Sequence, residues 1–206
     1  MIQIETASGQ EVIVAPCLRL RFSWVGDHWK QEMVSVGDSV GVPMIWSVEA
    51  NNTLGDHSRV VSPTYQQIDV RMADSVARAL LVGQAGPHHF SAAVEVSEAA
   101  NGVVVDVDVA DRCREPVEAL AATYVMENAA GQLHQGGAGG LVWDHATHHL
   151  IFEADPPTRV LAASHGFGSL QVQALATIDP AARTHRFRYR WRWINEPDAQ
   201  IWDRTA

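Results

Sequence analysis

The sequence predicts an all-β protein, and three observations support this fold class. Apolar and polar residues alternate with a period of two in many segments, as is typical of strands with one buried face and one exposed face. Turn-forming residues separate these segments at intervals of roughly 8–12 residues. Helical patterns are scarce. We therefore expect an antiparallel β-sandwich of about a dozen strands, with a closed β-barrel as the alternative.

The alternating segments recur along the whole chain. They are residues 17–22, 67–72, 90–110, 119–127, 140–143, 149–154, 158–164, 169–179 and 184–194. The longest of them, residues 90–110, predicts a hairpin whose two strands are joined through Asn101 and Gly102, a dipeptide that suits a tight turn. The sequence allows at most one or two short helices, at residues 74–82 and 115–122, because each of these segments begins with a helix-start signal.

The length and composition favour one domain. The chain has 206 residues, 47% of them hydrophobic and 19% charged, which is enough to build a core without disulfides or structural metal. Residues 47–64 are polar, contain glycine and proline, and alternate only weakly. We expect a single all-β domain over residues 1–206, with a long loop or weak boundary near residues 47–64.

Targeting signals and cysteine patterns are absent from the sequence. The first 20 residues lack the basic region and apolar run of a signal peptide, and no stretch approaches the roughly 20 apolar residues of a membrane-spanning helix. Cys17 and Cys113 are too few for a disulfide framework and lack zinc-site spacing, so we interpret them as small buried hydrophobic residues. These observations predict a soluble, cytoplasmic protein that does not bind membranes.

The net charge disfavours nucleic acid as a partner. There are 24 acidic and 15 basic residues, giving a formal charge of −9, which opposes attraction to phosphate backbones. Five of the arginines nevertheless lie between Arg183 and Arg192. This basic strip on an acidic protein needs its own explanation.

Arginines and aromatic residues alternate in the last strong segment, His185–Trp193. On a strand, Arg186, Arg188, Arg190 and Arg192 share one face, and Phe187, Tyr189, Trp191 and Trp193 share the other. The favoured interpretation is structural: the rings are buried, and the arginines pair with acids on neighbouring strands. Candidate partners are Asp106, Asp108, Glu95 and Glu153. The functional alternative is that the arginine row binds a small anionic ligand or a protein partner.

Histidines provide the second candidate site. The metal hypothesis uses His134, His145, His149 and His165, which fall within a short part of the chain. The segment from His145 to His149 is expected to form a hairpin turn and cannot supply three ligands alone. His88, His89 and Glu95 are only loosely similar to a metal-binding pattern. A site for a divalent transition metal would therefore have to draw its ligands from several segments.

No motif in the sequence identifies a known enzyme. There is no nucleophile elbow, phosphate-binding loop or dinucleotide fingerprint. Paired carboxylates such as Asp106 and Asp108 have a spacing that glycosidases could use, but alternating acids are common on a solvated strand. We expect a non-enzymatic binding or assembly protein that needs no cofactor. The alternative is a metal-dependent hydrolase or oxygenase that uses the histidines from His134 to His165. Self-association into a homo-oligomer is compatible with either interpretation.

Overall fold

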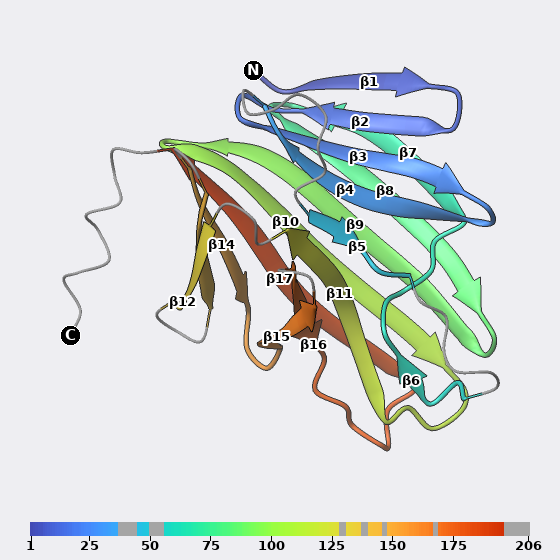
Figure 1. The fold of residues 1–206 in the computed structure, drawn as a ribbon. Helices are drawn as coiled ribbons and strands as arrows, with labels where there is room; N and C mark the ends of the chain where they lie inside the picture. Colours follow the sequence, from blue (N-terminus) through green and yellow to red (C-terminus); the bar gives the residue numbers. More distant parts are fainter. Residues whose placement is uncertain are drawn as a thin grey trace.

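A computed structural model of the chain describes residues 1–36, 45–49, 56–127, 131–136, 140–145, 148–166 and 169–195. All its regular elements are β-strands, and they form two sheets that face each other as a sandwich (Figure 1). Every strand pair is antiparallel except that of β6 with β11. The predicted all-β sandwich is confirmed, and the sheets do not close into a barrel.

The first sheet has nine strands. In spatial order they are β1 (Gln3–Ala7), β2 (Gln10–Val14), β3 (Leu18–Val25), β4 (His28–Ser35), β5 (Ile45–Ser47), β11 (Ala119–Glu127), β16 (Ser169–Leu175) and β15 (Arg159–Gly166), with β6 (Arg59–Val60) beside β11. The sheet therefore joins the N-terminal hairpins to strands from the second half of the chain.

The second sheet has eight strands. In spatial order they are β12 (Gly131–Gln135), β13 (Leu141–His145), β14 (His148–Ala154), β17 (Thr184–Asn195), β10 (Gly102–Cys113), β9 (His88–Ala99), β8 (Val76–Ala85) and β7 (Gln67–Ala73). The two sheets approach each other where β1 meets β7 and again where β14 meets β15. Between these two lines of contact lies the hydrophobic core.

The structure contains more strands than the sequence predicts. Short strands such as β1, β5 and β6 span only two to five residues, too few for an alternating pattern to stand out. Both segments considered as helices lie in strands instead: residues 76–82 begin β8, and residues 119–122 begin β11. Asp74 has a left-handed φ of 57° in the turn before β8, which starts a hairpin rather than a helix.

The predicted hairpin at residues 90–110 is confirmed as β9 and β10, but its turn lies one residue earlier. Ala99 pairs with Gly102, so Ala100 and Asn101 form the two-residue turn. Gly102 is the first residue of β10, and a Cβ atom there would lie 1.8 Å from the Trp193 carbonyl oxygen. This glycine therefore permits the close approach of β17 rather than the turn itself.

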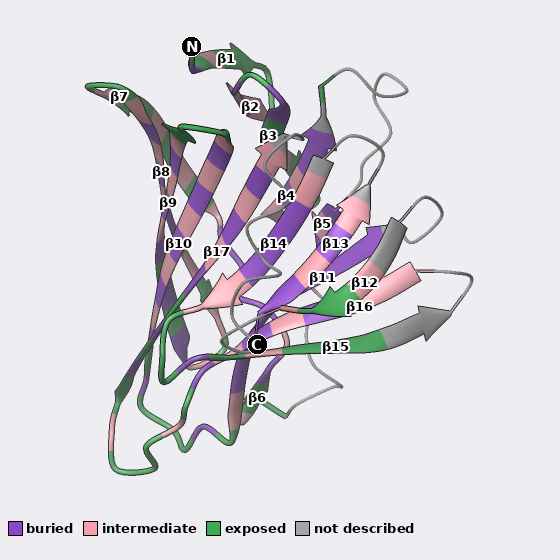
Figure 2. Cartoon of the chain, turned by 90° about the vertical axis from the view of Figure 1, so that its left-hand side faces the viewer, coloured by how far each residue is buried: buried purple, intermediate pink, exposed green. Residues whose placement is uncertain are grey.

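The core lies between the two sheets and follows the alternation of each strand. Figure 2 shows buried and partly exposed residues alternating along β10, β17 and β14. The rings of Phe187, Tyr189, Trp191 and Trp193 are at most 4% exposed, as predicted from the sequence. Phe152 stacks on Trp191 with 4.0 Å between ring centroids. A one-residue slip of β17 would expose all four rings, so the pattern fixes its register.

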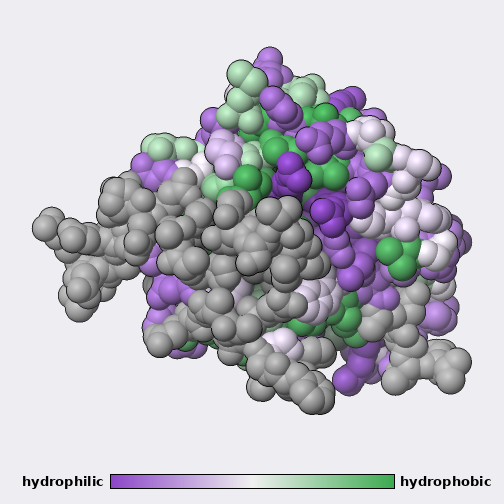
Figure 3. Space-filling view, turned by 45° about the horizontal axis from the view of Figure 1, so that its top comes forward, coloured by the Kyte–Doolittle hydropathy of each residue, from purple (hydrophilic) through white to green (hydrophobic). Residues whose placement is uncertain are grey.

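The face of the molecule drawn in Figure 3 mixes polar and apolar residues. Figure 3 shows hydrophilic residues interspersed with smaller apolar areas on the upper face of the molecule. Among the described residues, Trp24 is the most exposed aromatic side chain and Leu161 the most exposed leucine, at 42% and 52%. Within the described ranges, no helix is long and apolar enough to cross a membrane.

Candidate functional site

The four arginines of β17 lie on the outer face of the eight-stranded sheet, because their strand alternates and its rings face inward. Pairing with β10 places Arg190 opposite Asp106 and Arg188 opposite Asp108. On the other side of β17, Arg190 lies opposite Glu153 of β14. Residues directly opposite each other on one sheet face have their side chains in contact range. The sequence-predicted partners therefore lie beside the arginines.

Asp108 is the centre of the strongest part of this charge ladder. The Arg188 Nε–H donates to Asp108 Oδ2 at 2.8 Å, and the Arg186 Nε–H donates to Oδ1 at 2.6 Å. A second donor of Arg186, Nη2–H, also reaches Oδ2. Partial burial raises the pKa of Asp108, but the two guanidinium groups outweigh it and hold the pKa below the usual value. Asp108 is thus an anion shared by two arginines.

Arg190 and Arg192 complete the ladder with longer contacts. The Arg190 Nε–H donates to Asp106 Oδ1 at 2.9 Å. The terminal nitrogens of Arg190 lie 3.9 Å from carboxylate oxygens of Glu153 and Asp155, and Arg192 also lies 3.9 Å from Glu153. These last three distances allow electrostatic attraction but exceed hydrogen-bond length. Arg192 is therefore the most loosely paired member of the row.

The ladder continues across the sheet toward its β7 edge. Glu95 lies opposite both Asp106 of β10 and Arg78 of β8, and it pairs with Arg78 at 2.6 Å. This contact neutralises Glu95, which would otherwise repel Asp106. The outer face consequently carries columns of charge in the order base, acid, acid and base on β8, β9, β10 and β17.

A groove of about 320 Å³ lies over the ladder. It is lined by Ala93, Glu95, Asp106, Val107, Asp108, Asp155, Arg188, Tyr189 and Arg190. A guanidinium carries several N–H donors in a planar fork. Among described residues, Arg188 makes its ion pair through Nε, with Asp108. Its terminal nitrogens therefore remain available for a carboxylate or phosphate in the groove.

Asp144 is the acceptor for two of the four histidines in the metal hypothesis. His134 on β12 places Nε2 3.1 Å from Asp144 Oδ2, and His149 on β14 places Nδ1 2.5 Å from Oδ1. The side chains of His145 and His165 lie outside the described residues. Within the described part of the chain, no three histidine, cysteine or acidic groups converge as metal ligands. The metal site stays a prediction.

The sequence did not single out a buried polar pair at the opposite end of the second sheet. His88 Nδ1 lies 2.8 Å from Asp111 Oδ2, and these side chains are 1% and 0% exposed. The one indication in the sequence was the position of Asp111, which falls on the same face of its strand as the buried Val107 and Val109. An acid on the inward face of a strand needs a partner, because an unpaired buried carboxylate is strongly unfavourable.

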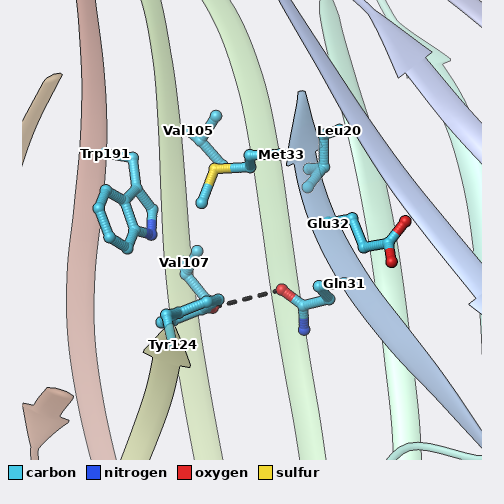
Figure 4. Close-up of a pocket in the computed structure, with 8 residues that line it drawn as sticks. All are labelled: Leu20, Gln31, Glu32, Met33, Val105, Val107, Tyr124 and Trp191. Carbon is cyan, nitrogen blue, oxygen red and sulfur yellow. Dashed lines mark hydrogen bonds between the residues drawn. The ribbon is translucent and has the colours of Figure 1, made fainter. Parts of the chain in front are cut away.

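A second cavity lies inside the sandwich and is too small for a ligand. Figure 4 shows the residues that line it: Leu20, Gln31, Glu32, Met33, Val105, Val107, Tyr124 and Trp191. Its volume is about 10 Å³, close to what one water molecule requires. The Tyr124 hydroxyl donates to Gln31 Oε1 at 3.3 Å beside it. This cavity belongs to the core, so the outer groove is the better candidate for binding.

Comparison with known proteins gives no functional assignment: no family model matches the chain, and a search of the curated proteins finds no match. The candidate site therefore depends on the geometry of this chain.

Proposed function

We propose that the chain is a non-enzymatic binding or assembly protein, and that the groove over β10 and β17 is its binding surface. The observation that supports this proposal is the set of terminal guanidinium donors of Arg188 and Arg192, which face solvent beside the groove. Arg188 is 53% exposed and Arg192 is 36% exposed. The hydrogen bond to Asp108 holds Arg188 in place before a ligand arrives, whereas Arg192 is only attracted to Glu153 at 3.9 Å.

The chemistry of the groove fits a ligand that bears carboxylates, either a small anion or an acidic segment of a protein partner. A carboxylate accepts two parallel N–H bonds from a guanidinium fork. The net charge of −9 and the acids of the ladder oppose a long polyanion. A ligand with few charges is therefore favoured over a nucleic acid.

The test compares a double variant, Arg188→Ala with Arg192→Ala, with the control Arg71→Ala. Arg71 is an exposed arginine of β7 on the same sheet face, outside the residues that line the groove. Calorimetric titration at low ionic strength uses citrate as the small anion and a glutamate-rich peptide as the protein segment. We expect the double variant to lose binding to at least one probe, whereas Arg71→Ala retains it.

Thermal unfolding and size-exclusion chromatography complete the test. If the double variant melts at a lower temperature while neither probe binds the wild-type protein, the arginines are purely structural and the proposal is wrong. If the wild-type protein self-associates and the double variant does not, the partner is a second copy of the chain.

A further inference from the structure

A thiol, an imidazole and a carboxylate lie in a row beneath a short surface segment. The row consists of Cys113, His88 and Asp111, and the segment, here called the strap, consists of residues 56–58. Cys113 Sγ lies 3.8 Å from His88 Nε2, and His88 Nδ1 lies 2.8 Å from Asp111 Oδ2. β6, which follows the strap, lies near the β8–β9 hairpin and the end of β10 at the lower right of Figure 1.

Strand pairing assembles the row. Cys113, the last residue of β10, lies opposite His88, the first residue of β9, and Asp111 lies two residues earlier on the same inward face. Phe90 stacks on the His88 ring with an interplanar angle of 7°, which fixes the ring orientation. All three members of the row are at most 2% exposed.

A carbonyl of the strap is hydrogen-bonded to Nε2, the nitrogen of His88 that faces the thiol. The His57 carbonyl oxygen lies 2.6 Å from His88 Nε2, and a carbonyl can only accept, so Nε2 must carry a proton. Nδ1 faces a carboxylate, so this contact also requires a proton. His88 and Asp111 therefore hold two protons between them, and Nε2 cannot accept a third from Cys113.

Local contacts shape the strap, but little of it is buried. The Asp56 carboxylate accepts the N–H and the O–H of Ser58, at 2.9 and 2.7 Å. The Ser58 carbonyl accepts the N–H groups of Glu118 and Ala119, while Asp56 and His57 are exposed. The His88 contact is thus the buried anchor of an otherwise solvent-facing segment, which is the type of segment that opens locally.

We propose that Cys113 is a concealed modification site for electrophiles, covered by the strap and uncovered when His88 loses a proton. Without that proton, the Nε2 lone pair faces the His57 carbonyl oxygen, and the two acceptors repel each other. Once the strap moves away, Nε2 accepts the S–H proton of Cys113. The thiolate then attacks the electrophilic carbon, forming an S–C bond while the leaving group departs with its electron pair.

The neighbouring charges define the pH at which the site opens. Burial lowers the pKa of His88, but hydrogen bonds to Asp111 and to the His57 carbonyl, with the charges of Asp111 and Glu115, raise it overall. The strap is therefore closed below the ordinary histidine pKa of about 6.5 and opens as the pH rises through the raised value. Asp111, Cys113 and Glu115 are the described titratable groups that act directly on His88. His185 of β17 lies opposite Asp111, and Tyr65 interacts electrostatically with Asp111, while His57 contacts His88 through its backbone carbonyl.

Burial suppresses the thiol while the strap is closed. It raises the pKa of Cys113, and the charges of Asp111 and Glu115 raise it further. Cys17 provides an internal control, because it is also buried and its pKa is raised to about 11, yet its described contacts include none with the row. Both thiols should be inert in the closed protein, and only Cys113 should respond to opening of the strap.

The experiment measures iodoacetamide labelling of each cysteine by mass spectrometry from about pH 6 to about pH 9. We expect Cys113 labelling, corrected for the reactivity of a free thiol, to accelerate at least about tenfold over Cys17 as the pH rises. His88→Asn should remove this pH-dependent acceleration. Circular dichroism at each pH verifies that the fold is intact.

Gly86 offers a second test that keeps His88. A Cβ atom at Gly86 would lie 2.6 Å from the His57 ring, so Gly86→Ala should displace the strap and accelerate Cys113 labelling at neutral pH. Gly26→Ala is the matched control, since Gly26 has a similar positive φ and no atom within 4 Å. Equal labelling of Cys113 and Cys17 in every variant and at every pH would show that only global unfolding exposes Cys113, and would overturn the proposal.

Discussion

Tyr124 and Tyr189 join the two sheets through a hydroxyl–hydroxyl hydrogen bond of 2.7 Å across the core. Tyr124 belongs to β11 of the nine-stranded sheet, and Tyr189 belongs to β17 of the eight-stranded sheet. Because Tyr124 donates its proton to Gln31, Tyr189 must be the donor in the bond between the tyrosines. Burial raises the pKa of both phenols, so both remain neutral at physiological pH.

This chain of donors predicts an unequal effect of removing each hydroxyl. Tyr189→Phe removes one hydrogen bond and leaves Tyr124 bonded to Gln31, so it should lower the free energy of unfolding by about 1 kcal/mol. Tyr124→Phe leaves both Tyr189 and Gln31 without this partner and should cost about 1–3 kcal/mol. Urea unfolding of the two variants measures the difference. Equal losses would contradict the assigned direction of donation.

The charge ladder predicts an acid-sensitive contribution from Asp108. Its pKa is lower in the folded protein than in the unfolded chain, so its stabilisation is present above the unfolded value of about 3.9. It is lost as the pH falls through the lowered folded pKa. Asp108→Asn should reduce the free energy of unfolding by about 1 kcal/mol at neutral pH. The wild-type and variant curves should converge in strong acid, and a pH-independent gap would count against this account.

Comparing the stability of Gly86→Ala with that of Gly26→Ala measures the free-energy cost of displacing the strap. Alanine at either position adopts a left-handed φ, at a cost of about 1–2 kcal/mol. Only at Gly86 does the new Cβ also contact the His57 ring. Thermal unfolding should therefore show Gly86→Ala to be less stable than Gly26→Ala by about a further 1 kcal/mol. Equal melting temperatures would mean that the ring moves away freely.

The metal hypothesis has its own measurement. Because no three potential ligands converge within the described part of the chain, we expect protein made without a polyhistidine tag to contain less than one equivalent of transition metal. His149→Ala should then leave the metal content unchanged. One equivalent of metal that disappears in His149→Ala or His145→Ala would instead support the enzyme alternative.

The sequence predicted those features that depend on alternation along one strand. The inward rings and outward arginines of β17 follow from its period of two, and the valine and aspartate pattern of β10 identified the partners Asp106 and Asp108. The alternation along these strands fixes their pairing register, because a slip of one residue would reverse the buried and exposed faces.

Features that depend on contacts between distant segments could not be predicted. The strap contacts His88 through the backbone carbonyl of residue 57, a group that any residue type could supply. The turn between β9 and β10 was predicted at Asn101–Gly102 but lies at Ala100–Asn101, because Gly102 is needed within β10 where β17 approaches at Trp193. In each case, a neighbour far away in the sequence decided the local structure.

The position of β17 has a consequence for how the protein forms during synthesis. This strand lies between β14 and β10, so it links β12–β14 to β7–β10 within the eight-stranded sheet. It is also the last described strand along the chain. As the ribosome makes the polypeptide from its N-terminus, β10 and β14 must wait with unpaired edges until residues 184–195 emerge. The nascent protein is therefore most exposed to aggregation just before its arginine and aromatic strand is complete.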